Sequence, residues 1–156
     1  MVAPRQGLPR RPCLKVDMIR TFVMTATFLL AGTAALADPC TAIPDKGPTP
    51  AYLSRSAEFS GRAVYIADGD GLCVALGLTP DQWVEVRLQD FYAPELNAPG
   101  GQAAKQTLSR IVAGRTVKCR ADHRSYDRIV STCWLDGRSV GDLMRRAGVA
   151  EGGNGR

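Results

Sequence analysis

Hydrophobic and polar residues alternate along three short stretches in the first half of the chain, which predicts three β-strands there. RAVYIA (62–67) ends at Asp-Gly-Asp-Gly, a turn signal, and LCVALG (72–77) follows it. After a loop, WVEVRLQD (83–90) places its aliphatic residues on one face and Glu85 and Arg87 on the other. The period of two indicates strands that bury one face each.

From residue 102 the spacing of apolar residues becomes helical, returns to that of strands, and becomes helical again near the C-terminus. QAAKQTLSRIVAG (102–114) carries an apolar stripe of helical spacing and ends at a glycine suited to the residue just past a helix. TVKCRA (116–121) and RIVSTCWL (128–135) return to strand patterns. SVGDLMRRAG (139–148) opens with a capping-box-like start and predicts a second helix.

The order of elements predicts the class of fold. Three strands, a helix, two strands and a helix suit the α+β class, mainly β, with a five-stranded barrel of the oligonucleotide-binding (OB-fold) type. One helix follows the third strand, and the other is C-terminal. We expect this domain to span 61–150, with a core small enough that disulfides would help to stabilise it.

The segments that flank this domain have different patterns. Residues 38–60 are rich in proline and small polar residues and predict an extended arm, and 151–156 predict a flexible tail. Residues 1–37 predict a leader that contains a signal peptide, with a start at Met18 and cleavage near Ala37. The apolar run before Ala37 is shorter than the about 20 residues of a membrane span, although an uncleaved anchor is the alternative. We therefore expect a secreted or periplasmic protein with no stable membrane anchor after cleavage.

Removing the leader changes the meaning of the net charge. The chain has 20 Lys and Arg against 15 Asp and Glu. Residues 1–37 hold five of the cations and one of the anions, which leaves 15 against 14. The basic pI therefore says little about nucleic acid, and any affinity for a polyanion must come from local clustering.

The cysteines fit an oxidising compartment. Cys13 falls in the leader, and an even set of four remains. Cys119 and Cys133 lie in the middle of adjacent predicted strands, within disulfide reach if those strands pair antiparallel. We therefore expect Cys119–Cys133, with Cys40–Cys73 tying the arm to the second strand. Zinc is the rival interpretation, but no C-x-x-C spacing occurs and His123 is the sole histidine.

Charged residues gather at three places where strands end or begin. Asp68 and Asp70 flank a glycine at the first turn, and Arg87 belongs to the third strand. Glu95 follows that strand, and Arg128 begins the fifth. Guanidinium groups suit phosphate oxygens, while carboxylates activate water or hold a hard divalent cation. Taken singly, an Asp-Gly pair forms a turn and an arginine lies on the surface more often than either forms a site.

At these residues the chain resembles the staphylococcal nuclease (thermonuclease) family. The shared pieces are DGD at 68–70, RL at 87–88, APE at 93–95 and Y-x-R at 126–128, with DG, V, L and GVA at the end. No single piece is specific, but their order and spacing cover 61–150. The resemblance implies a five-stranded barrel and calcium-dependent cleavage of DNA or RNA.

The resemblance also implies roles for individual residues. Arg87 and Arg128 would be catalytic phosphate-binding arginines, and Glu95 would be the carboxylate that orders or activates the attacking water. Asp70 would bind Ca²⁺ directly, with Asp68 in support and the backbone carbonyl of Ala93 as a further ligand. Tyr126 is placed where it would flank a nucleotide.

Two positions depart from the family pattern. Tyr92 replaces an aspartate that would be a second calcium ligand, and a neutral phenol is a poor ligand for a hard cation. We expect this change to weaken the site for Ca²⁺ or another divalent cation. Asp90 is a possible substitute, although it would need a shift or bulge. Tyr92 would then pack at the barrel rim or stack on a base of the substrate. The second departure is Gly71, where the family often has a hydroxyl residue.

The leading hypothesis is a secreted, nuclease-like hydrolase that cleaves phosphodiester bonds of DNA or RNA with a divalent cation. The alternative is a catalytically impaired nucleic-acid-binding module on the same barrel. An envelope protein with an unrelated partner is a third possibility. A Ser-His-Asp hydrolase is disfavoured because nothing around the serines resembles a nucleophile elbow. We expect a monomer whose partners are DNA, RNA or nucleotide phosphates.

Overall fold

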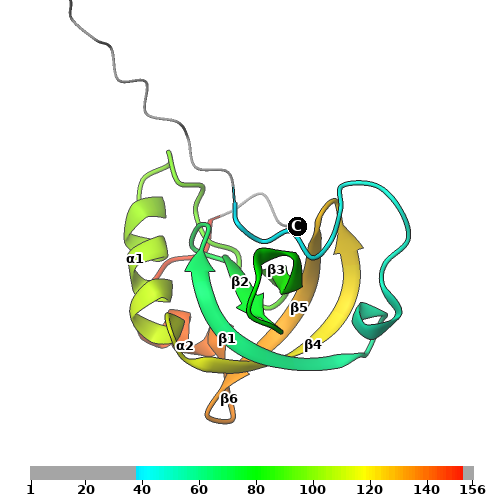
Figure 1. The fold of residues 1–156 in the computed structure, drawn as a ribbon. Helices are drawn as coiled ribbons and strands as arrows, with labels where there is room; N and C mark the ends of the chain where they lie inside the picture. The colour runs from blue at the N-terminus through cyan, green and yellow to red at the C-terminus, as the bar shows by residue number, and fades with distance from the viewer. Residues whose placement is uncertain (1–37, 153–156) are drawn as a thin grey trace, which may run out of the picture. The chain divides into compact units, whose positions relative to one another are not determined.

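The predicted strands and helices occur in the predicted order in residues 38–152, the part of the chain that this computed structural model describes (Figure 1). The strands are β1 (Glu58–Ile66), β2 (Gly71–Ala75), β3 (Trp83–Leu88), β4 (Thr116–Ser125), β5 (Arg128–Leu135) and the two-residue β6 (Arg138–Ser139). The helices are α1 (Gly101–Val112) and α2 (Val140–Arg146), with short 3-10 helices η1 (Ala51–Leu53) and η2 (Pro80–Gln82).

The five longer strands close into a barrel. They are hydrogen-bonded in the order β3-β2-β1-β4-β5, and the short β6 pairs with the end of β5. All of these pairs are antiparallel, and a parallel pairing of β3 with β5 then joins the two ends of the sheet. The result is a mixed, mainly β barrel of the OB-fold type, as predicted.

The period of two in the sequence corresponds to the inside and outside of the barrel. Along β5, buried and partly buried residues alternate without exception. On β3, Val84, Val86 and Leu88 are fully buried in the core. α1 closes the barrel with Ala104 and Leu108, and α2 adds Met144. Figure 1 shows α1 standing beside β1.

The arm contributes more to the fold than its lack of periodicity predicts. β1 begins at Glu58, three residues before the predicted start of the barrel domain. Ile43, Leu53 and Phe59 are buried and belong to the same hydrophobic cluster as the barrel interior. The arm also bonds to the chain near β3, through Thr41 N–H to the Pro80 carbonyl (3.0 Å) and Ala42 N–H to the Trp83 carbonyl (3.1 Å). Single apolar side chains of an irregular segment give no periodic signal.

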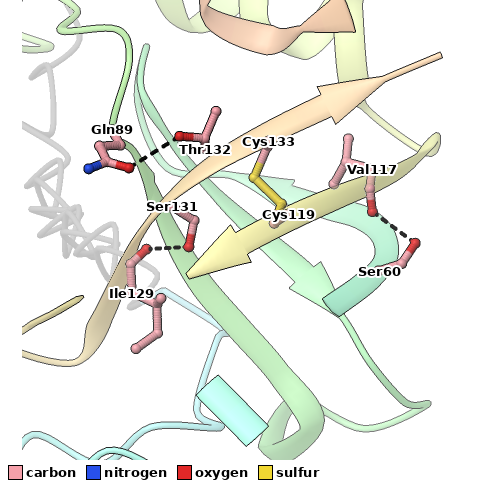
Figure 2. Close-up of a disulfide and its surroundings, with 8 residues drawn as sticks. All are labelled: Ser60, Gln89, Val117, Cys119, Ile129, Ser131, Thr132 and Cys133. Carbon is pink, nitrogen blue, oxygen red and sulfur yellow. Dashed lines mark hydrogen bonds between the residues drawn. A yellow bond between two sulfur atoms is a disulfide. The ribbon is translucent and has the colours of Figure 1, made fainter. Parts of the chain in front are cut away.

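Both expected disulfides are present. Cys119 and Cys133 are directly opposite each other on β4 and β5, with Cα atoms 4.1 Å apart, and their buried disulfide links the two adjacent strands (Figure 2). Cys40 of the arm is bonded to Cys73 of β2, with Cα atoms 5.7 Å apart. The first staples neighbouring strands, and the second fixes the arm against the barrel.

Some predictions concern residues outside the described range. The signal peptide, its start at Met18 and its cleavage near Ala37 all lie there, as does most of the predicted tail. Among residues 38–152, no helix combines the length and the apolar character needed to cross a membrane.

Candidate anion and metal site

The turn between β1 and β2 fixes two carboxylates side by side. The side chain of Asp68 folds back onto the backbone of the turn, and its Oδ1 accepts a hydrogen bond from the N–H of Asp70 at 2.9 Å. A Cβ at Gly71 would lie 2.9 Å from that same oxygen, so a side chain there would crowd the Asp68 carboxylate. Glycine at 71, a departure from the family pattern, thus suits the turn.

Asp70 points into the structure and meets Arg87 of β3. The β2–β3 register pairs Gly71 with Arg87, and an Nη2 of Arg87 lies 3.4 Å from Oδ2 of Asp70. The same oxygen accepts the N–H of Ala93 at 3.1 Å. Burial raises the pKa of Asp70 well above its ordinary value, and the nearby Asp68 carboxylate raises it further, while Arg87 lowers it. The single positive charge of Arg87 therefore balances the negative charges of Asp68 and Asp70 only in part.

Arg128 reaches this face from the other end of the sheet. The parallel pairing aligns Val86 with Ile129 and Arg87 with Val130, so the start of β5 lies beside β3. Among residues 38–152, no ion pair joins Arg128 to a carboxylate within 4.0 Å. Its guanidinium is therefore available to an external anion.

Glu85 is a residue of this face that the site prediction missed. It is 9% exposed and pairs in register with Cys73 of β2. Burial raises the pKa of Glu85 to about 7, Asp38 and Asp127 raise it as well, and Arg128 lowers it. The alternation along 83–90 puts Glu85 on the same face as Arg87, and this was the signal that could have identified it.

The arm covers the Glu85 end of the face. Asp38 accepts the N–H of Cys40 at 2.7 Å, and the same oxygen lies 3.2 Å from Sγ of Cys73. Burial raises the pKa of Asp38 as well. The Cys40–Cys73 disulfide therefore brings a further carboxylate, that of Asp38, close enough to Glu85 to raise its pKa.

The loop after β3 is joined to the first turn through close backbone packing. A Cβ at Gly69 would lie 2.4 Å from the Cβ of Ala93 and 2.6 Å from that of Ala104 in α1, so only glycine permits this approach. Ala93 meets Asp70 through its N–H, whereas the resemblance implied a role for its carbonyl. Glu95 is exposed, and its carboxylate makes no hydrogen bond or ion pair with residues 38–152. Its backbone carbonyl accepts the N–H of Ala98 at 2.8 Å.

The structure joins Asp90 to α2. Oδ2 of Asp90 accepts the hydroxyl of Ser139, and a Cβ at Gly141 would lie 2.8 Å from the carboxylate. Its backbone carbonyl accepts a hydrogen bond from Arg145. These contacts with the start and end of α2 disfavour Asp90 as a replacement metal ligand.

Two tyrosines expected near the substrate lie in different settings. Tyr92 is partly buried, and its backbone carbonyl accepts the N–H of Gly152 at 3.1 Å. Tyr126 is 81% exposed at the β4–β5 turn, in a left-handed conformation with φ of 61°, two residues before Arg128. Tyr126 is thus open to a ligand beside the arginine.

These residues define a class of protein: a closed OB-type barrel with guanidinium groups and buried carboxylates gathered on the outer face of β2, β3 and β5. Planar guanidinium groups bind tetrahedral oxyanions, and adjoining carboxylates supply the hard oxygen ligands of divalent cations.

Comparison with known proteins gives relatives of one prevailing kind. An uncharacterized endonuclease of Escherichia coli is 33% identical over 96 residues, which cover 60% of this chain and 61% of the relative. An uncharacterized endonuclease of Haemophilus influenzae is 32% identical over 91 residues, covering 57% and 49%. Protein ParB of Escherichia coli is 37% identical over 81 residues, covering 51% and 44%. The chain spans about three fifths or less of the length of these relatives, and no family model matches it.

Proposed function

We propose that this protein is a thermonuclease-like phosphodiesterase that cleaves DNA or RNA at the Asp70–Arg87–Arg128 face. The observation that carries the proposal is the contact of Arg87 with the buried Asp70, on a strand whose parallel neighbour begins with Arg128, which forms no ion pair within residues 38–152. The endonuclease names of several relatives support it.

Each residue has a role that follows from its chemistry. Arg87 and Arg128 would hold the scissile phosphate and neutralise the charge that grows on its oxygens during attack. Glu95 is exposed, and its carboxylate has no hydrogen-bond or ion-pair partner in the described part of the chain; it would orient a water molecule and accept its proton. Tyr126, exposed beside Arg128, would contact the sugar or base of the adjoining nucleotide.

The donor set fits a divalent cation held by few protein ligands. Asp70 and Asp68 would hold it, since both present carboxylate oxygens from one turn and their charge is incompletely compensated. Mg²⁺ often binds through one or two carboxylates together with substrate phosphates, and Ca²⁺ requires more oxygen ligands. When bound, such an ion polarises the phosphate and lowers the pKa of a coordinated water. With Tyr92 in place of an acid, we expect weak cation binding before substrate arrives.

The test is a cleavage assay on the purified oxidised protein, with DNA and RNA, in Ca²⁺, Mg²⁺ or EDTA. We expect cleavage that requires the cation and falls about 100-fold or more in Arg87→Ala, because one preorganised charge partner of the transition state is lost. Arg146→Ala, which removes an exposed arginine of α2, is the matched control and should cleave normally. Undiminished cleavage by Arg87→Ala would contradict the proposal.

A nucleic-acid-binding module is the second candidate. In the loop after β3, Asp90 is bonded to Ser139 at the start of α2 and position 92 is a phenol. Neither position therefore offers a carboxylate to a cation held by Asp70, and this favours the module. Absence of turnover with every ion, together with binding that weakens in Arg87→Ala, would support the module over the enzyme.

We also propose that the protein works in an oxidising compartment, secreted or periplasmic, as a monomer. Two disulfides within the barrel and arm support this location, since such bonds are rare in reducing compartments. The leader before Asp38 would direct the export.

A further inference from the structure

A groove of about 870 Å³ runs between β1 and α1, outside the site described above. Its β1 wall is the run 62–66 and its α1 wall includes Gln102, Lys105 and Ser109. Ala63, Val64 and Ala113 provide apolar surface. Figure 1 shows α1 and β1 side by side along this length.

The charged residues that line the groove are all cations. Arg62, Lys105 and Arg110 contribute to it, and no carboxylate does. Within residues 38–152, none of the three forms an ion pair with an acidic side chain. Arg62 donates to the Gly114 carbonyl at 2.8 Å and Arg110 to the Thr107 hydroxyl at 2.7 Å, so both guanidinium groups are held in place but remain uncompensated. Because cations and anions are nearly balanced in 38–156, this local excess indicates an anionic ligand.

An aromatic ring lies among these cations. Tyr65 is partly buried in the groove wall, and Nζ of Lys105 lies 5.8 Å from the centroid of its ring. Gln102, Gln106 and Ser109 line the groove as well and offer neutral hydrogen-bonding groups. Cations that follow a backbone, with an aromatic ring between them, are the features by which proteins bind single-stranded nucleic acid.

The groove begins where the candidate site ends. β1 ends at Ile66, a lining residue, and the chain then enters the turn that carries Asp68 and Asp70. That turn packs on α1 through the close approach of Gly69 to Ala104, next to Lys105. From Gln102 to Arg110 the α1 wall is roughly 12 Å long at 1.5 Å per residue. This is about the length of three or four stacked nucleotides at 3.4 Å each.

We propose that the groove between β1 and α1 binds a single-stranded segment of the nucleic acid, continuous with the strand whose phosphate lies at Arg87. Lys105 and Arg110 contact its phosphates, and Tyr65 stacks on a base. The inference rests on the proposed function in taking nucleic acid as the substrate. It assigns to the protein an extended binding site that a dinucleotide does not fill.

The test separates binding along the groove from chemistry at the site. Fluorescence anisotropy in EDTA, across a salt series, measures the Kd of a labelled 12-nucleotide single-stranded DNA. Lys105→Gln/Arg110→Gln should raise Kd about tenfold or more and reduce the slope of log Kd against log salt by about 1.4, since each single-strand phosphate contact contributes about 0.7. Arg62 is left intact because it also bonds Gly114. Arg146→Gln is the control, with unchanged melting temperatures verifying the fold.

Each result has a distinct meaning. If the double variant binds and responds to salt as Arg146→Gln does, the groove proposal is overturned. A loss of affinity and of salt slope in the double variant, with Arg146→Gln unchanged, supports it. If wild-type protein cleaves nothing but the double variant still loses affinity, the groove proposal stands and the proposed hydrolysis fails.

A second variant distinguishes nucleic acid from other polyanions. Tyr65→Leu keeps apolar bulk but removes the ring, and loss of one base stack should weaken DNA binding roughly fivefold or more. Binding of inorganic polyphosphate, which has no bases, should not change. Equal affinity of Tyr65→Leu and wild type for DNA would overturn the assignment to nucleic acid and would leave a general polyanion site.

Discussion

At the scale of single residues, we expect the phenol at position 92 to weaken cation binding at the candidate site. Asp68 and Asp70 supply two carboxylates from one turn, and the loop after β3 adds the neutral Tyr92. The backbone of this loop is held independently of the phenol, by the bond from Gly152 N–H to the Tyr92 carbonyl. A substitution at 92 therefore changes the ligand set without removing that support.

We predict that Tyr92→Asp tightens Ca²⁺ binding about tenfold or more, because an added carboxylate raises both the charge and the number of oxygen ligands. Tyr92→Asn is the matched control, since it has the same size as the aspartate but no charge. Isothermal titration calorimetry of both variants and the wild type measures the difference. Equal affinities of the aspartate and asparagine variants would show that position 92 does not face the cation.

Some features of the candidate site could be predicted from the sequence and others could not, for physical reasons. The turn at Asp68–Asp70 and the strand that carries Arg87 follow from turn residues and a two-residue period, both of which are local, whereas the contact of Asp70 with Arg87 comes from the pairing of β2 with β3. Glu85 is 9% exposed although the alternation places it on the outer face of β3, and no local pattern encodes that burial. Asp90 is bonded to Ser139, a partner 49 residues away, so its structural role was equally hidden. The proposed roles of all the site residues, Asp70 and Arg87 as well as Glu95, Arg128 and Tyr126, stay predictions.

At the scale of elements, the arm is a structural part of the barrel. Its carboxylate at Asp38 lies against Cys73, and its bonds to Pro80 and Trp83 hold it near β3. Proline-rich composition predicted an extended segment, and the cysteine count predicted its attachment. The sequence did not reveal that the side chains of Ile43 and Leu53 pack in the barrel core, because isolated apolar residues have no period.

We predict that Cys40→Ala/Cys73→Ala loosens the arm while the barrel stays folded. The disulfide closes a span of 33 residues, and its loss should lower the free energy of unfolding by about 2–4 kcal/mol. Hydrogen exchange should show lost protection at the Thr41 and Ala42 amides, which bond to Pro80 and Trp83.

Cys119→Ala/Cys133→Ala is the comparison, since that disulfide closes a span of 14 residues between β4 and β5 and does not touch the arm. It should lower stability and leave the protection of Thr41 and Ala42 relative to the barrel amides unchanged. Equal arm protection in the two double variants would contradict the role of Cys40–Cys73.

At the scale of the whole molecule, closing the barrel buries an ionisable group at a cost that depends on pH. The pKa of Glu85 rises from 4.5 to about 7 on folding, mainly through burial. Between these values the unfolded chain has released a proton that the folded protein retains, so stability falls as pH rises. Below about 4.5 Glu85 is protonated in both states and this cost is absent; the cost grows as pH rises and reaches its full size above about 7.

We predict that Glu85→Gln removes this dependence, so that the variant gains on the order of 2 kcal/mol relative to wild type between pH 4.5 and 7.5. Urea unfolding in EDTA at several pH values measures the difference. Glu58→Gln is the control: Lys118 lowers the pKa of Glu58 below 4.5, so its effect varies only at lower pH and should be flat in this range. A constant difference for Glu85→Gln would show that Glu85 is ionised in the folded protein.

The overall architecture was the most predictable level. Alternation, helical period and turn residues together specified the order of the elements and the barrel class. They did not specify that β3 and β5 pair in parallel, because no local feature of either strand identifies a partner so far away in the sequence. That pairing nonetheless closes the barrel and places Arg128 beside β3.

The parallel pairing of β3 with β5 also has a consequence for the time course of folding. Arg87 and Arg128 are separated in the chain by α1 and β4, so they become neighbours only through contacts of long sequence separation, which are the slow ones to form. A chain whose β5 has not yet docked therefore presents one arginine without the other. Binding of phosphate by both arginines, as proposed above, would thus arise late, after the barrel has closed, and under the proposed function a partly folded molecule would not cleave nucleic acid.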